Sequence, residues 1–169
     1  MIVVVVGALL FFSLRSKGTQ HSGATVSGTF LVGHTAPKLT ATDLDGKAFS
    51  LASLRGKAVI VTFGASWCHP CNEEYPLLVK AAAKHAGKLV VVSIMHDDLV
   101  PDEHAFLKKY AVKWQAIDDN ANVISDAFHV NEIPDTFFIS PSGKVLTREF
   151  GLTSQGALDK PLNQLLSST

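Results

Sequence analysis

The sequence contains little cysteine: only Cys68 and Cys71 occur among its 169 residues. Two cysteines are too few for a small fold held together by several disulfides. They are also too few for a structural zinc site with a second Cys-x-x-Cys pair, and the seven histidines are scattered singly. We therefore expect no metal. Charge of either sign is not in excess, because 15 basic residues balance 15 acidic ones, so no net field favours nucleic acid.

The N-terminal residues 1–14 are almost wholly apolar, MIVVVVGALLFFSL. This run is shorter than the ~20 residues of a membrane-spanning helix but fits the core of a signal peptide or a signal anchor. Arg15 and Lys17 follow the run, an order that argues against export, and a buried strand or helix is the alternative. Because residues 15–32 are rich in Gly, Ser and Thr, we expect a flexible tether there and a membrane anchor or signal segment before it. Residues 33–169 are expected to form one domain.

Hydrophobic periodicity predicts a regular series of elements within this domain. Short runs at 39–42 and 47–50 flank an Asp-Gly turn and predict a hairpin. Continuous apolar runs at 58–63 and 89–95 predict strands that are buried on both faces, with a helix from about 68 to 85 between them. The other expected elements are a helical turn at 50–56, a helix at 101–110, an edge strand at 114–117, a short helix at 122–128, a hairpin of strands 136–139 and 145–150, and a final helix at 154–166 interrupted by Pro161.

This order of elements predicts the fold class. Two parallel strands joined by a helix, followed by an antiparallel hairpin and a helix, give an α/β domain with a central mixed β-sheet flanked by helices on both sides. The early hairpin adds a small N-terminal unit to this sheet.

The two cysteines stand two residues apart in the motif Trp-Cys-His-Pro-Cys at residues 67–71. A strand, a short loop and a helix that opens on Cys-x-x-Cys are typical of a dithiol redox site. A covalent haem site would need a histidine directly after the second cysteine, where this chain has Asn72. A metal site and a structural disulfide are the alternatives. No organic cofactor is required, because the dithiol is itself the redox group.

The position of each cysteine predicts its role. Cys68 precedes the first helical turn, where unpaired N–H groups and the helix dipole stabilise an anion, so we expect its thiolate to be the nucleophile. Cys71, on the same helical face, is expected to be the resolving and more buried cysteine. His69 would make the site more oxidising when protonated, and Pro70 would shape the first turn. Glu74, one turn beyond Cys71, is a candidate to hold or relay a proton, with a solvated surface charge as the alternative.

The combination of Trp-Cys-x-x-Cys with Ile133-Pro134 before a β-rich run resembles the thioredoxin superfamily. The early hairpin and residues 33–37 resemble its TlpA-like/ResA-like branch, whose members are typically membrane-anchored thiol-disulfide oxidoreductases. The resemblance covers residues 33–166. It implies that Pro134 is cis, and that Trp67, Ile133, Pro134 and Asp135 form the substrate-binding surface, with the Ile133 backbone free to pair with a peptide.

Several positions depart from related patterns. Thioredoxin has a buried Asp six residues before its first cysteine, where this chain has Thr62, while Glu74 matches a Glu common in the TlpA-like branch. Asp135 replaces the usual Thr and would raise the cysteine pKa values. Peroxiredoxins need Thr and Pro where this chain has Ala65 and Val61, which argues against peroxidase activity. Copper chaperones of the Sco type space their cysteines by three residues instead of two.

The resemblance implies a monomer that exchanges electrons with protein thiols and disulfides and receives them from a membrane or soluble dithiol donor. The expected location is the cell envelope, anchored to the inner membrane with the domain in the periplasm, or secreted if the first segment is cleaved. The leading expectation is a reductant, for example in cytochrome c maturation. An envelope oxidant or isomerase is one alternative, and a copper-binding module is an alternative of a different class.

Overall fold

The computed structural model describes residues 30–168. The expected anchor and all but the end of the expected tether lie outside these residues. Within residues 30–168, no helix has both the length and the apolar character needed to cross a membrane. Leu31 is buried in the hydrophobic core and Val32 packs against it, so the packed domain already includes residues that the sequence assigned to the tether.

The described chain contains two sheets and four α-helices. The first sheet is a hairpin of β1 (Thr40–Thr42) and β2 (Ala48–Ser50), followed by the 3-10 helix η1 (Leu51–Leu54). The main sheet contains β3 (Ala58–Gly64), β4 (Leu89–Met95), β5 (Ala116–Asp118), β6 (Asp135–Ile139) and β7 (Val145–Phe150). The helices are α1 (His69–Lys84), α2 (Val100–Lys109), α3 (Val123–Phe128) and α4 (Gln155–Leu166).

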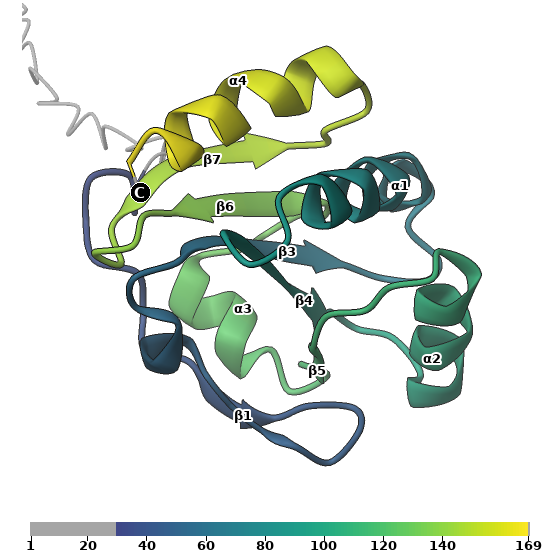
Figure 1. The fold of residues 1–169 in the computed structure, drawn as a ribbon. Helices are drawn as coiled ribbons and strands as arrows, with labels where there is room; N and C mark the ends of the chain where they lie inside the picture. The colour runs from purple at the N-terminus through teal and green to yellow at the C-terminus, as the bar shows by residue number, and fades with distance from the viewer. Residues whose placement is uncertain (1–29, 169) are drawn as a thin grey trace, which may run out of the picture.

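The main sheet has the strand order β5-β4-β3-β6-β7 (Figure 1). β3 pairs with β4 in parallel and with β6 antiparallel, so the sheet is mixed and β3 is its central strand. β5 pairs only with the last three residues of β4, Ser93–Met95. The expected mixed sheet with an additional N-terminal hairpin is confirmed.

Helices cover both faces of this sheet (Figure 1). On one face, α1 and α4 pack Leu78 and Leu158 against Ile60 and Phe138 of the sheet. On the other face, Phe128 of α3 and the hairpin residue Phe49 belong to a second cluster. This two-sided covering explains why β3 reads as an unbroken apolar run, since every one of its residues is buried.

The final helix differs from the expectation. α4 is one continuous helix from Gln155 to Leu166 with Pro161 inside it, so the division at Pro161 was wrong. Leu158, Leu162 and Leu165 are buried on both sides of the proline. Their packing against the sheet offsets the hydrogen bond that a proline removes from a helix.

The topology joins two distant parts of the sequence at one edge of the sheet. β3 ends at Gly64, and β6 begins at Asp135, which pairs with Phe63. α1 starts directly beyond the end of β3. The Cys-x-x-Cys motif and the Ile133-Pro134 segment are therefore both placed at this edge.

Candidate redox site

Cys68 and Cys71 form a disulfide with an S–S distance of 2.04 Å at the start of α1. Cys68 is the N-cap residue of the helix, and its Sγ accepts a hydrogen bond of 3.2 Å from the backbone N–H of Cys71. Cys68 is 3% exposed and Cys71 is 0% exposed. A Cβ atom at Gly64 would lie 3.3 Å from the Cys71 Sγ, so the helix packs closely on the end of β3. Cys68 is thus the more exposed of the two cysteines, and Cys71 the more buried.

The loop before the cysteines is held by the loop that follows β4. Asp98 accepts hydrogen bonds from the backbone N–H and, at 2.8 Å, from the hydroxyl of Ser66. The indole N–H of Trp67 donates to the carbonyl oxygen of Asp97 at 2.8 Å. Asp98 in turn donates its backbone N–H to the Asn120 side chain at 2.8 Å. Sequence reasoning missed Ser66 and Asp98, although both follow the carboxyl ends of adjacent parallel strands, which meet at one edge.

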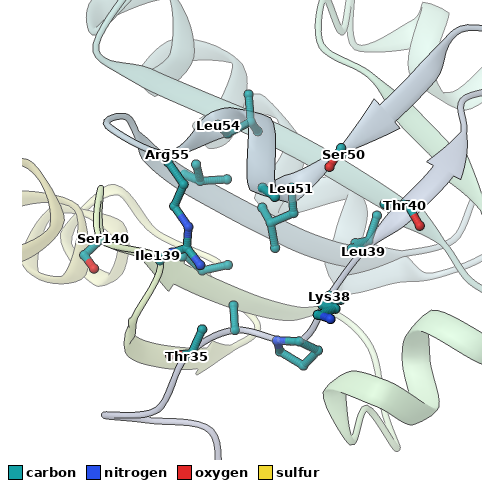
Figure 2. Close-up of a pocket in the computed structure, with 15 residues that line it drawn as sticks. Thr35, Lys38, Leu39, Thr40, Ser50, Leu51, Leu54, Arg55, Ile139 and Ser140 are labelled. Atoms are coloured by element: carbon teal, nitrogen blue, oxygen red, sulfur yellow. The ribbon is translucent and has the colours of Figure 1, made fainter.

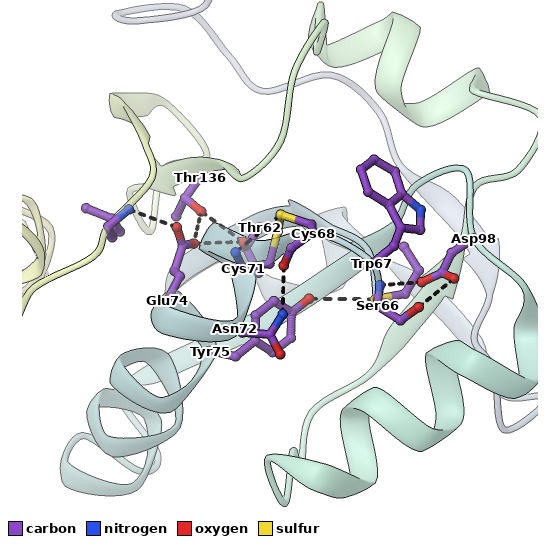
Figure 3. Close-up of a disulfide and its surroundings, with 12 residues drawn as sticks. Thr62, Ser66, Trp67, Cys68, Cys71, Asn72, Glu74, Tyr75, Asp98 and Thr136 are labelled. Atoms are coloured by element: carbon purple, nitrogen blue, oxygen red, sulfur yellow. Dashed lines mark hydrogen bonds between the residues drawn. A yellow bond between two sulfur atoms is a disulfide. The ribbon is translucent and has the colours of Figure 1, made fainter.

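Glu74 is fully buried beside the disulfide, not solvated on the helix surface (Figure 3). The hydroxyl groups of Thr62 on β3 and Thr136 on β6 both donate hydrogen bonds to its Oε1 atom. Its Oε2 atom accepts a hydrogen bond of 3.0 Å from the backbone N–H of Leu152. Two strands and the segment before α4 thus converge on one carboxyl group.

Burial raises the pKa of Glu74, and the hydrogen bonds from Thr136, Leu152 and Thr62 oppose this effect. The carboxyl group therefore takes up a proton more readily than one in water, while three donors still stabilise its ionised form. A group with these properties can accept a proton in the interior and return it. The neighbouring Glu73 is exposed, as the sequence indicated.

The remaining residues of the motif lie on the surface. His69 and Pro70, the first two residues of α1, are exposed. Trp67 is 60% exposed, so it is not a core residue and presents its ring beside Cys68. These positions are open to a partner molecule.

The Ile133–Pro134 peptide bond is cis, as the family resemblance implied. Pro134 is buried and Ile133 is half-buried. The structure shows no hydrogen bond from the Ile133 backbone to any described residue. The main chain at this point is thus available to an extended peptide.

Asp135 does not face the surface. Its side chain is fully buried and forms an ion pair with Arg148 on β7, whose Nε lies 2.9 Å from Oδ1 and 3.0 Å from Oδ2. Arg148 also lies over the rings of Phe137 and Phe150. Burial raises the pKa of Asp135, and the hydrogen bond and charge of Arg148 oppose this. The structure therefore places this residue, expected at the substrate surface, beneath it.

Another buried acid, Glu103, lies on α2, which packs Phe106 against Tyr75 of α1. Neither oxygen of Glu103 has a hydrogen-bond partner among the described residues. Burial first, and then the charges of Asp118 and Asp98, raise its pKa to about 8. From the sequence it was only an acid in the first helical turn.

A cavity of about 290 Å³ lies away from the cysteines (Figure 2). It is bounded by the segment before β1, by η1, and by Val59 and Ile139. These two residues form a pair at the opposite ends of β3 and β6 from Gly64 and Asp135. The cavity is thus separate from the redox site. Within residues 30–168, no cluster of three or more His, Cys, Asp or Glu side chains is arranged to hold a metal ion.

Comparison with known proteins agrees with this site. Residues 32–148, most of the chain, match the AhpC/TSA family. This chain belongs to the AhpC/TSA family. Among relatives, the thiol-disulfide oxidoreductase ResA of Bacillus subtilis (strain 168) is 30% identical over 134 residues, which cover 78% of this chain and 74% of that protein.

Solved structures place this AhpC/TSA family member more narrowly. A secreted Mycobacterium tuberculosis disulfide oxidoreductase, homologous to E. coli DsbE, is 31% identical with a TM-score of 0.69, over 75% of this chain and 96% of that one. A thioredoxin-family thiol:disulfide interchange protein from Chlorobium tepidum TLS is 29% identical with a TM-score of 0.71, over 78% and 95% of the two chains. The protein therefore has the thioredoxin fold and is a thiol-disulfide oxidoreductase.

Proposed function

We propose that this protein reduces disulfides in other proteins of the cell envelope, with Cys68 as the nucleophile and Cys71 as the resolving cysteine. The observation that carries the proposal is the Cys68–Cys71 disulfide at the start of α1, beside the buried carboxyl group of Glu74. The helix N-terminus stabilises a thiolate at position 68, because the backbone N–H of Cys71 donates a hydrogen bond to its sulfur.

The reaction proceeds in two exchanges. The Cys68 thiolate attacks one sulfur of the partner disulfide, so that a mixed disulfide forms and the partner's other sulfur leaves as a thiolate. Cys71 then loses its proton and attacks the Cys68 sulfur. The second partner thiolate leaves, and two electrons have passed from the dithiol to the partner. The product on this chain is the disulfide of the structure.

Glu74 is the proposed acceptor of the Cys71 proton. It lies three residues from Cys71, on the next turn of α1, and its raised pKa suits it to hold a proton in the interior. Glu74 occupies a position where thioredoxin-like proteins of this branch have an acid, and it meets Thr62, where thioredoxin itself has one. In the reverse reaction, Glu74 would return the proton to the Cys71 thiolate.

The partner would bind across Trp67 and the Ile133–Pro134 segment. The exposed indole supplies apolar surface, and the unpaired backbone of Ile133 supplies a donor and an acceptor for an extended peptide. Asp135 acts from beneath this surface through its charge, which Arg148 balances. His69 and Pro70 set how strongly the thiolate is stabilised.

The proposed location is the outer side of a membrane, with residues 1–14 as the anchor and the domain facing the periplasm or its equivalent. The apolar N-terminal sequence and the similarity to a secreted Mycobacterium tuberculosis disulfide oxidoreductase support this. Apocytochrome c is the proposed example of a substrate, and a membrane or soluble dithiol protein would restore the reduced state.

Two cysteine variants test the proposed roles. Cys68→Ser should abolish reduction of insulin by the protein, whereas Cys71→Ser should accumulate a mixed disulfide through Cys68 that mass spectrometry detects. A Cys68→Ser variant that still reduced insulin would contradict the assignment of the nucleophile. A matched Ser66→Ala variant, which keeps both cysteines, should still reduce insulin, at a rate lowered only by the lost hydrogen bond to Asp98.

The reduction potential distinguishes a reductant from an oxidant or isomerase. Equilibration with glutathione should give a potential much closer to that of thioredoxin, about −270 mV, than to that of a strong oxidant. A potential near that of strong oxidants, about −120 mV, would overturn the reducing role. Stoichiometric copper binding without thiol exchange would instead favour a metal-handling function.

A further inference from the structure

The loop after β4 exposes two large aliphatic side chains beside the redox site. Leu99 is 68% exposed and Val100 is 40% exposed, next to a Trp67 that is 60% exposed. Single exposed apolar residues are ordinary on protein surfaces. These three residues, however, belong to two segments that are hydrogen-bonded to each other. Trp67 lies in the loop before Cys68, and Leu99 and Val100 lie where the loop after β4 leads into α2.

Hydrogen bonds hold these two segments against each other. The Trp67 indole donates to the carbonyl of Asp97, and Ser66 donates twice to Asp98, the residue directly before Leu99. Figure 3 shows Trp67 and Asp98 side by side. We call Trp67, Leu99 and Val100 the apolar rim. The apolar rim begins at Trp67, the residue before Cys68, and the Cys68 sulfur is the atom that a partner must reach.

Helix stability does not explain the two aliphatic residues of the rim. Leu99 is the N-cap of α2 and makes no side-chain cap hydrogen bond. Ser, Thr, Asp and Asn are strongly preferred at an N-cap, and Leu is among the poorest choices. Val100, the first helical residue, is β-branched and also a weak helix former. Helix capping alone would favour a polar residue at position 99.

We propose that the apolar rim is a specificity surface for protein substrates that carry apolar side chains next to their reactive cysteine. This inference rests on the proposed function, because it extends the site at which a partner disulfide meets Cys68. A partner sulfur can reach the 3%-exposed Cys68 only if the flanking partner residues lie on the surrounding surface. On the side of the β4–α2 loop, that surface is apolar. Partners with apolar residues beside their cysteine therefore bury the most apolar area there, which favours their binding.

Two disulfide-linked peptides provide the test, one with Leu and Phe beside the cysteine and the other with Ser at both places. The wild-type domain should reduce the apolar peptide faster. In a Leu99→Ser/Val100→Thr variant, kcat/KM for the apolar peptide should fall by about five- to tenfold, chiefly through KM, and kcat/KM for the Ser peptide should stay unchanged. Ser at the N-cap supports α2, and Thr keeps the branched shape, so the variant should fold.

Phe30→Ser is the matched control, because Phe30 is 58% exposed but packs against His129. It should leave both rates unchanged. An equal loss of kcat/KM on both peptides in the double variant, or no loss on either, would overturn the proposed specificity surface. Binding of the wild type to phosphatidylcholine vesicles, lost in the double variant while peptide preference persists, would overturn it in favour of a membrane contact. Residual activity of Cys68→Ser would instead overturn the proposed function itself.

Discussion

The hydroxyl of Thr62 on β3 donates a hydrogen bond of 3.0 Å to the Glu74 carboxyl group on α1. In thioredoxin the strand position itself carries the acid. Here the acid comes from the helix and the strand supplies a donor that stabilises its charge. The buried carboxyl group thus stays next to the cysteines although it is attached to a different element.

Thr136 is expected to tune this carboxyl group. Thr136→Val removes a hydrogen bond that lowers the pKa of Glu74, so the pKa should rise further and the pH at which exchange reaches half its maximum rate should move up. The free energy of unfolding should fall by about 1–2 kcal/mol. Thr147→Val is the control, since its hydroxyl bonds only Glu149 on the same strand. An unchanged pH profile of insulin reduction in Thr136→Val would contradict a role of Glu74 in proton transfer.

Asp98 should hold the loop before Cys68 in place. In Asp98→Asn one oxygen acceptor becomes an amide donor, so the backbone N–H of either Ser66 or Leu99 loses its acceptor. We expect a stability loss of about 1–3 kcal/mol and a lower rate with every disulfide, large or small. Asp97→Asn is the matched control, because Asp97 bonds Trp67 only through its backbone carbonyl oxygen. Asn also tolerates the positive φ of 49° at this position. Equal rates in the two variants would refute this role.

Glu103 should make the stability of the protein fall as the pH rises. Its pKa is 4.5 in the unfolded chain and about 8 in the folded one, so between these values the folded state keeps a proton that the unfolded state has released. Its contribution to stability is therefore complete below pH 4.5 and is lost as the pH approaches 8. The loss should be on the order of a few kcal/mol.

Urea unfolding from pH 5 to pH 8 measures this effect. Glu103→Gln cannot ionise and should show a flatter pH dependence than the wild type, whereas the exposed control Glu73→Gln should follow the wild type. Parallel curves for Glu103→Gln and the wild type would show that the Glu103 carboxyl group is not the source.

Loss of one partner of the Asp135–Arg148 ion pair should reduce the free energy of unfolding more than loss of both. Arg148→Met leaves a fully buried carboxylate without its partner and should cost about 3–5 kcal/mol. The double variant Asp135→Asn/Arg148→Met should recover most of this loss, because no buried charge remains. A double-mutant cycle by urea unfolding measures the coupling. Additive losses would show that the two residues act independently.

Prediction from the sequence was most accurate for elements whose structure the local residue pattern determines. The runs at Leu89–Met95 and Val145–Phe150 became strands with the predicted bounds, because they contain β-branched residues and turn residues lie beside them. β5 was less accurate, since it starts at Ala116 rather than Trp114. Trp114 instead donates its indole N–H to Ser93, a tertiary contact that no local pattern reports.

The site was predictable only as far as its local motif. The spacing from Cys71 to Glu74 gives a helical face, but burial of that face depends on Thr136 and Leu152, which lie 62 and 78 residues away. Arg148 meets Asp135 across a hairpin with a register shift between Phe138 and Ile139, so the pairing cannot be counted from the turn. Asp98 binds Ser66 between loops 32 residues apart.

Two hydrogen-bond donors of Glu74 lie far from it in the sequence, and this separation matters while the chain is being synthesised. The cysteines, Thr62 and Glu74 emerge from the ribosome well before Thr136 and Leu152, because synthesis runs from the N-terminus. Until β6 is in place, Glu74 lacks two of its three donors and much of its covering. A nascent chain that ends before β6 therefore carries both thiols without the donors from Thr136 and Leu152, and the proton transfer proposed for Glu74 needs the complete sheet.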